Sequence, residues 1–477
     1  MQLLPPDGSS EAGGNSPTKL HMAIQITLST LLFSTCSLWS KSWKKNLGGL
    51  VSKTLQCVFF LFLCITSYAQ QLSDTIPVVQ DSSQLPLPVE KQMDFSDVFQ
   101  KIFHTQPKPV EESSSSLALL PVLGYNPSFG FVLGAKVNVG KQYGDPANTN
   151  YSIYSLNAFT STKGIVTLQA RHNVFKPENK WNYQGNWQLS RFGLVDYGLG
   201  VKSFEDEGTF TVDKYQTTNP DSAFPMQYKY FRFNEKIFKK ISQGFYAGVG
   251  ISLDIYANID DLKLDSLGYS PHQIYCDRYG FDSNKYSSNG LLFTFQYNTR
   301  DHPLRAYKGI YAEMTFRLNQ EWLGSSSNST QVQYDIRKYW SLSKKNPEHV
   351  FALWFWGSYR LGGVVPYLEL PNTASDTYNR VGEGYPIGRF RGPSYACIQP
   401  EYRFPVTRNK FISGVFFFNF QSASDGTDQK LYENWAVAGG IGLRILFDKV
   451  SRTTLCVDFA RGNYGSSGIY SGLGEIF

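Results

Sequence analysis

The sequence predicts an all-β fold: a transmembrane antiparallel β-barrel, with sixteen strands expected, over residues 117–477. Three observations predict it. Polar and apolar residues alternate with a period of two, which is typical of strands with two different faces. The alternating runs last roughly 9 to 12 residues, long enough to cross a bilayer at a tilt. Aromatic residues gather at the ends of these runs, as in Trp354–Trp356, where an interfacial girdle would lie.

Residues 180–192 show the alternation plainly. One face carries Trp181, Tyr183, Gly185, Trp187 and Leu189, and the other carries Asn182, Gln184, Asn186, Gln188 and Ser190. A soluble sandwich also alternates, but its strands average about 5 to 6 residues. In lipid a β-sheet must close, because an open edge leaves backbone groups unpaired in hydrocarbon. Sixteen units of about 22 to 23 residues fit the length, and fourteen or eighteen strands fit nearly as well.

The composition excludes other classes of protein. Charged residues make up 18% of the chain and aromatic residues 16%, and the net charge is +6. The mean hydropathy of −0.29 argues against a bundle of membrane-spanning helices. The aromatic content argues against disorder, and the small charge excess gives no reason to expect a nucleic-acid partner.

The first 116 residues precede the barrel. Residues 1–69 read as a signal segment, because the apolar run Leu55–Ile65 has a basic flank and is followed by Ser67-Tyr68-Ala69, with cleavage expected after Ala69. Within it, residues 1–43 read as an overlong start or an extended basic region. A membrane anchor is the alternative, although the run is too short to span. Residues 70–116 read as a periplasmic linker of low complexity with one short amphipathic helix at Phe95–Phe103.

No catalytic, cofactor-binding or metal site is expected. Cys276, Cys397 and Cys456 follow the signal segment without CxxC or Cys/His spacing, so three free thiols are favoured over one disulfide. The histidines are scattered, and no Gly-x-Ser-x-Gly, HExxH or P-loop sequence occurs. An enzyme with a Ser/His pair assembled only in space is the least favoured hypothesis.

A series of short stretches occurs in a fixed order along the barrel region. They are Leu120–Pro127 with Gly130, Tyr297–Asp301 with Gly309, Val365–Tyr367, Gly384–Gly392, Glu401–Pro405, Gly439–Arg444 with Asp458, and the final Phe477. In this order they resemble the barrel of the BamA/TamA family, also called the bacterial surface antigen family, in its Bacteroidetes-type members. The resemblance covers essentially all of residues 117–477.

The resemblance implies a function at the bacterial outer membrane: insertion or translocation of proteins through a lateral seam in the barrel. Its expected partners are outer-membrane lipid, unfolded outer-membrane proteins and accessory assembly subunits, and homo-oligomerisation stays open. Residues 70–116 are too few for one periplasmic POTRA module, so the chain resembles a barrel-only branch. The alternative is a passive channel or a structural barrel, which inward-facing residues such as Gln169, Arg171 and Gln296 would also suit.

The resemblance also assigns residues inside the barrel. The sixth-loop motif falls at Glu383, Gly384, Tyr385, Arg389 and Arg391, and its partners in the lumen fall at Asn419, Glu401, Arg444 and Asp458. Two departures matter: Glu383 stands where the family has arginine, and Asn419 stands where it has an acid. A glutamate can share a hydrogen bond with Asn419 but would repel an aspartate, which favours this register. A second register makes Phe390-Arg391-Gly392 the motif.

The seam is expected between the strand near Leu119–Leu123 and the strand near Tyr470–Phe477. Gly472 and Gly474 would weaken that last strand, and its edge would then be open to an incoming strand. Equally, these glycines could relieve crowding where the barrel closes. Phe477 resembles the terminal signal by which outer-membrane barrels are recognised for assembly.

Overall fold

The computed structural model describes residues 92–103, 115–126, 130–146, 148–201, 224–262, 270–449 and 452–477. The predicted signal segment and most of the predicted linker lie outside these residues. Every described residue belongs to one compact unit, Ser82–Phe477. Across the described ranges, no helix combines the length and the apolar character needed to span a membrane.

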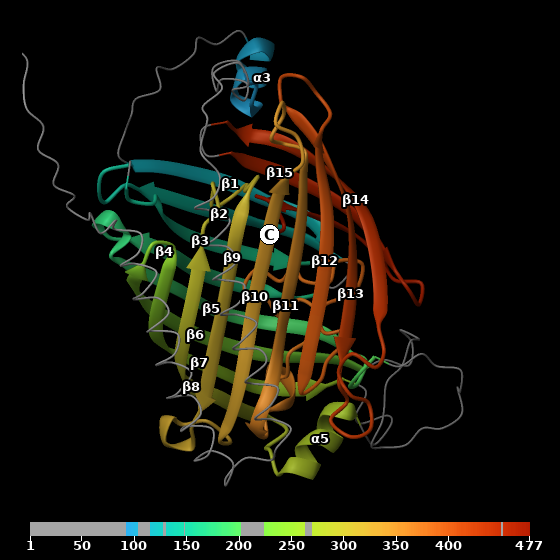
Figure 1. The fold of residues 1–477 in the computed structure, drawn as a ribbon. Coiled ribbons are helices and arrows are strands. Elements are labelled where there is room, and N and C mark those ends of the chain that lie inside the picture. The colour runs from blue at the N-terminus through green and yellow to red at the C-terminus, as the bar shows by residue number, and fades with distance from the viewer. Residues whose placement is uncertain are drawn as a thin grey trace, which may run out of the picture. The chain divides into compact units, whose positions relative to one another are not determined.

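The strands form one antiparallel sheet in which each strand pairs with the next along the chain (Figure 1). Their bounds are β1 Ser115–Asn126, β2 Gly130–Lys141, β3 Ser152–Ser161, β4 Val166–Phe175, β5 Trp181–Asp196, β6 Phe224–Ser242, β7 Phe245–Asp261, β8 Lys285–Asn298, β9 Gly309–Asn319, β10 Ser329–Ser341, β11 Val350–Gly363, β12 Ser394–Pro405, β13 Ile412–Ala423, β14 Ala436–Asp448, β15 Thr453–Gly462 and β16 Ser467–Leu473. The predicted all-β, antiparallel fold is confirmed.

Helical elements are few in the described residues. The helices are α3 Phe95–Phe103 and α5 Pro271–Tyr279, with 3-10 turns η3 Pro177–Asn179, η5 Glu321–Leu323 and η6 Tyr367–Glu369. Helix α3 begins at a reciprocal cap, in which Asp94 accepts from the Asp97 amide and Asp97 accepts from the Asp94 amide, each at 3.0 Å. Phe95 stacks on Phe447 of β14 with ring centroids 5.7 Å apart. The short helix predicted at this position is confirmed.

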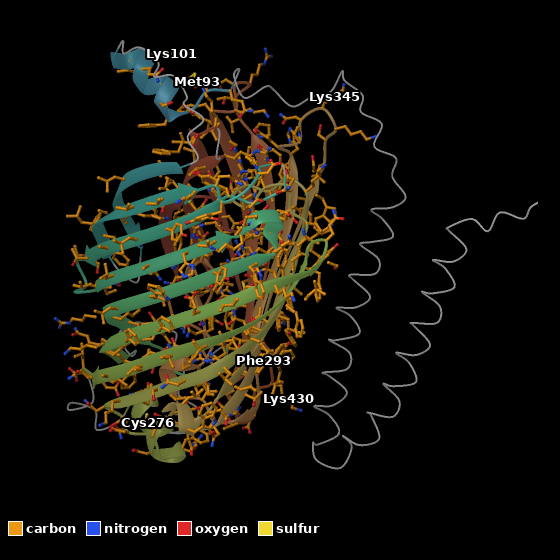
Figure 2. All side chains as sticks on the ribbon, turned by 90° about the vertical axis from the view of Figure 1, so that its left-hand side faces the viewer. Met93, Lys101, Cys276, Phe293, Lys345 and Lys430 are labelled. Carbon is orange, nitrogen blue, oxygen red and sulfur yellow. The ribbon has the colours of Figure 1, made fainter. Side chains whose placement is uncertain are left out.

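The two ends of the sheet differ in their connections. Short turns at 243–244, 342–349 and 406–411 mark one end, called the short-turn end, and longer connections at 262–284, 364–393 and 424–435 mark the other, called the long-loop end. Figure 2 shows Met93, Lys101 and Lys345 at the short-turn end and Cys276 and Lys430 at the opposite end.

The outer face of the sheet is apolar and the inner face is polar. Exposed outer side chains include Leu168, Leu189, Val249, Phe293, Phe416, Ile441 and Phe459. Buried inner side chains include Gln169, Asn182, Asn186, Gln296, Glu313 and Asn419. This distribution is the reverse of that in a soluble protein, and it confirms the faces predicted from the period of two.

The connection between β11 and β12, residues 364–393, folds into the space enclosed by the curved sheet, and we call it the lumen loop. Its side chains Val365, Tyr367, Leu370, Val381, Tyr385 and Phe390 are all buried. They pack in two apolar clusters, one with residues of β5–β8 and one with residues of β10–β15. The lumen loop therefore supplies much of the interior that the polar strand faces leave unfilled.

Candidate functional site

The predicted sixth-loop motif lies in the lumen loop against β13 and β14. The Asn419 side-chain amide donates to the backbone carbonyl of Glu383 at 2.6 Å. The contact predicted between the two residues is therefore made by the Glu383 backbone and not by its carboxyl group. Gly384 has a φ of +102°, and a Cβ there would lie 2.7 Å from the Cβ of Ala438, so only glycine fits this close approach.

The Glu383 side chain is buried in an acidic environment. It is 4% exposed, and among the described residues its Oε2 atom has no hydrogen-bond partner. Burial raises the pKa of this carboxyl group well above its usual range, and the neighbouring Asp458 and Glu401 raise it further. Glu383 therefore holds a proton to higher pH than an exposed glutamate does.

The raised pKa of Glu383 predicts a pH-dependent stability. The folded state binds the Glu383 proton more tightly than the unfolded state does. The stabilisation of the folded state by this proton is complete below the ordinary pKa of 4.5 and is lost as pH rises toward the folded pKa. In that window, the free energy of unfolding of the wild type should fall by up to about 1.4 kcal/mol per pH unit relative to Glu383→Gln. Urea unfolding in detergent micelles across pH 5 to 9 measures this, and parallel curves for the two proteins would contradict it.

Tyr385 fastens the lumen loop to the strands behind it. Its hydroxyl donates to the Val437 carbonyl at 2.7 Å and accepts from the Asn463 amide at 2.9 Å. Its ring meets the edge of Phe390 with centroids 4.8 Å apart. One side chain thus joins the loop to β14 and to the turn between β15 and β16.

The two arginines of the motif have different partners, one inside the lumen loop and one outside it. Arg391 Nη1 donates to the carbonyls of Tyr367 at 3.0 Å and Leu368 at 3.2 Å. The Arg389 guanidinium lies 4.3 Å from the ring centroid of Tyr197. Neither contact involves Asn419 of β13. The geometry therefore supports the register that places Glu383 beside β13 over the one that makes Phe390-Arg391-Gly392 the motif.

Two of the predicted lumen partners, Asp458 and Glu401, form ion pairs with arginines of the sheet. Arg444 Nη1 lies 2.5 Å from Asp458 Oδ1, and its Nε lies 2.8 Å from Glu475 Oε2. Glu401 accepts from Arg403 at 2.9 and 3.0 Å. The arginine that pairs with Asp458 is therefore Arg444 of β14. The lumen loop contributes an acid, Glu383, to the same region.

The chain end, residues 474–477, turns into the interior. Strand β16 stops at Leu473, and Gly474, with a φ of +86°, donates its amide to the Thr454 carbonyl at 2.7 Å. Phe477 then packs beside Trp354, with ring centroids 5.1 Å apart, and its carbonyl accepts from Arg403 at 2.9 Å. The prediction that Phe477 belongs to the terminal strand is therefore wrong.

The Glu475 carboxylate explains this turn. If β16 continued with its period of two, Glu475 would share the outer face with Ile469, which is 48% exposed. Turned inward, it meets Arg305 Nε at 3.1 Å and Arg444. Burial alone would raise the pKa of Glu475, but the nearby arginines lower it to about 2. A charged residue on an apolar face was the sequence signal for the turn, and it was missed.

Arg380 joins the lumen loop to the chain end. Its Nη2 donates to the Leu473 carbonyl at 3.1 Å, and its Nη1 donates to the Glu475 carbonyl. Gly472, another predicted seam residue, has its Cα beside this guanidinium, since a Cβ there would lie 3.4 Å from Arg380 Nη2. No pattern in the sequence indicates Arg380, because its partners are backbone carbonyls far away in the chain.

The lumen loop has a second anchor toward the long-loop end. Glu369 pairs with Arg317 at 2.5 Å, and Arg317 also pairs with Asp254 at 2.8 Å. Asp254 accepts from Arg232 as well, at 2.6 Å, and its side chain is fully buried. This network ties the start of the loop to β6, β7 and β9.

A buried Cys, His and Asp lie in series near α5. Cys276 Sγ is 3.4 Å from His272 Nε2, and His272 Nδ1 is 2.9 Å from Asp261. Burial raises the pKa of Cys276 to about 12, so the thiol is not ionised, whereas nucleophilic chemistry requires the thiolate. Tyr275 of the same helix donates to the Val365 carbonyl at 2.8 Å. The cluster fits a packing role that seats α5 on the lumen loop.

Comparison with known proteins gives a family and several distant structural likenesses. The Omp85 superfamily domain matches residues 131–477. BamA from Haemophilus ducreyi lacking POTRA domains 1–3 is 13% identical, with a TM-score of 0.48 and coverage of 76% of this chain and 71% of that chain. CdiB from Acinetobacter baumannii is 10% identical, with a TM-score of 0.44 and coverage of 76% and 65%.

CdiB from Escherichia coli is 7% identical, with a TM-score of 0.46 and coverage of 77% of this chain and 63% of that chain. This chain therefore spans less than two thirds of either CdiB. No curated protein matches the sequence. Because all three TM-scores are low, the family assignment rests on the match to the superfamily domain alone.

Proposed function

Because this chain belongs to the Omp85 superfamily, we propose that it is a bacterial outer-membrane β-barrel that inserts or translocates proteins through a lateral seam between β1 and β16. In this proposal the sheet closes as a barrel of sixteen strands. Its partners are outer-membrane lipid, unfolded outer-membrane proteins and accessory assembly subunits. Its action is physical, with no enzymatic step, cofactor or nucleic acid.

The observation that carries the proposal is the state of the two terminal strands. Strands β1 and β16 stand at the two ends of the strand order and lie near each other, yet among the described pairings no ladder joins them. Strand β16 has 7 residues, whereas β1 has 12. Part of the β1 edge therefore lacks a strand of matching length beside it.

Backbone groups at such an edge can template an incoming strand. Pro121 within β1 has no amide hydrogen, and proline is tolerated in sheets mainly at edge strands and bulges. The chain end contributes too, because its turn at Gly474 withdraws the last residues from β16. These features support a weakly paired seam.

A passive channel or a structural barrel is the second candidate, and the polar inner face favours it. Amides and charges such as Gln169, Gln296 and Glu313 would suit a solvated passage. The lumen loop and the chain end occupy part of that interior, which favours a closed state of such a channel.

Locking the seam tests the proposal. Cells depleted of the protein should lose other barrel proteins from the outer membrane severalfold, as measured by quantitative proteomics, and the wild type should restore them. A variant with Leu119→Cys and Ile469→Cys carries exposed thiols on β1 and β16, which a reducible bifunctional maleimide can join. The joined variant should fail to restore barrel levels until the linker is reduced.

The matched control links two residues whose strands are already paired by backbone hydrogen bonds. Phe459 and Ile469 face each other across the β15–β16 ladder, so Phe459→Cys with Ile469→Cys should restore barrel levels in the linked state as well. Full rescue by the linked β1–β16 variant would overturn the seam mechanism. Unchanged levels of every other barrel on depletion would favour the channel or structural barrel instead.

A further inference from the structure

The outer face of the sheet carries an imidazole and a carboxylate in contact. The ladders place Tyr154, His172, Gly185 and Glu235 side by side in one row across β3 to β6. His172 Nε2 lies 3.2 Å from Glu235 Oε2, and Trp187 Nε1 donates to the same oxygen at 3.1 Å. The row lies on the apolar face, because Trp187 and the neighbouring Leu168 are both exposed.

Ionisable groups on a lipid-facing surface are costly, and they are retained mainly where they have a role. Pairing lowers the cost for His172 and Glu235, whose side chains are only 18% and 23% exposed. Gly185 makes the pairing sterically feasible, because a Cβ there would collide with His172 Nε2 and would lie 2.6 Å from Glu235 Oε2. The contact therefore depends on one residue without a side chain.

Beside this pair the outer face is hollowed by a cavity of about 610 Å³. Its lining includes Val137, Leu156, Ala170, Trp187, His172 and Lys176. The hollow arises because the small Ala170 pairs on one side with Leu156 and on the other with Trp187. An apolar floor with a polar rim results, open on the face that would meet lipid.

The rim toward the short-turn end is cationic and aromatic. Lys176 Nζ lies 5.4 Å from the ring centroid of Tyr143 and 5.9 Å from that of Tyr183. Lys141 Nζ lies 5.0 Å from the Tyr143 centroid. Tyrosine and lysine at a strand end are typical of the membrane interface, where phosphate groups lie.

We propose that this groove binds one glycerophospholipid of the surrounding membrane. Its phosphate lies against Lys176 and Lys141, and an acyl chain covers Ala170. Its glycerol backbone lies over the paired side chains of His172 and Glu235, which line the groove. The proposal rests on the membrane location given above and not on the insertion activity.

Native mass spectrometry of the full chain, released from mild detergent, tests the site. The wild type should retain one phospholipid per chain. Ala170→Trp fills the groove without changing charge, and His172→Leu with Glu235→Leu removes the polar pair. The protein is titrated with phosphatidylethanolamine or phosphatidylglycerol. Each variant should lower the fraction of chains that retain lipid by about tenfold or more. Ala247→Trp, on the outer face of β7 beside the exposed Phe295, is the matched control and should retain lipid as the wild type does.

A photo-crosslinking residue at Leu156 identifies the occupant, and heat-modifiable mobility on a denaturing gel verifies that every variant is a folded barrel. A lipid-mass adduct at Leu156 that disappears in Ala170→Trp supports the proposal. Equal lipid retention by the wild type and Ala170→Trp overturns it, and so does an adduct with a second protein. Lipid retention is independent of barrel assembly in cells, so failure here is distinguishable from failure of the insertion hypothesis.

Discussion

Replacing Glu475 with alanine is expected to lower the free energy of unfolding by about 3 to 5 kcal/mol, the usual cost of leaving buried charges uncompensated. The Glu475 carboxylate contacts Arg305 at 3.1 Å and Arg444 at 2.8 Å, and all three side chains are almost fully buried. Urea unfolding in micelles, followed by tryptophan fluorescence, measures the loss. Trp354 beside Phe477 reports directly on release of the chain end.

Glu178→Ala is the matched control, because Glu178 pairs with Lys180 at the surface with side chains 57% and 65% exposed. Its effect should stay within about 1 kcal/mol. The Glu475 contribution should also depend on pH. Since its folded pKa is lowered to about 2 from 4.5, the stabilisation is present above pH 4.5 and is lost as pH falls toward 2. Equal losses in the two alanine variants would contradict the role given to the chain end.

The second large effect is expected at Asp254. Its carboxylate accepts from Tyr230 at 2.6 Å, and it pairs with Arg232 at 2.6 Å and Arg317 at 2.8 Å. Asp254→Ala leaves both arginines with Glu369 as the nearest acid, and it should cost about 3 to 5 kcal/mol in unfolding free energy. The lumen loop should also become more sensitive to protease, because Arg317 holds Glu369 at 2.5 Å.

Asp277→Ala serves as the control at the same end of the sheet. Asp277 is exposed on α5 and accepts a surface hydrogen bond from Gln273 at 2.8 Å, a helical pair worth about 0.2 to 0.5 kcal/mol. Asp254→Asn keeps the shape of the side chain without its charge and should lie between the two. Protease sensitivity that is unchanged in Asp254→Ala would argue against this anchor for the lumen loop.

The sequence predicts the features that local rules determine. A period of two assigns Trp187 to one face and Gln188 to the other without knowledge of any partner strand. The helix at Phe95–Phe103 likewise begins at a cap formed by its own neighbours, Asp94 and Asp97. Both were predictable because the interactions that form them lie within a few residues.

The contacts that build the site are non-local, and here the sequence is less informative. The resemblance placed Glu383 beside Asn419, but it did not indicate which atoms of the two residues would be in contact. Arg305 and Arg380 show no pattern in the sequence, because their partners at the chain end become neighbours only after the sheet curves. His172 reads as one scattered histidine, although the alternation of β4 already puts it on the same face as Leu168 and Ala170.

The inward chain end also determines how this protein can be handled and in what order it can be built. Any tag fused after Phe477 would extend from an aromatic contact with Trp354 and would displace the residues that Arg403 and Arg305 hold. A reporter is better placed in the turn at 342–349, where Lys345 projects from the short-turn end (Figure 2). Because Phe477 contacts Trp354 of β11 and Glu475 contacts Arg444 of β14, residues 474–477 can take their inward position only once these strands are in place.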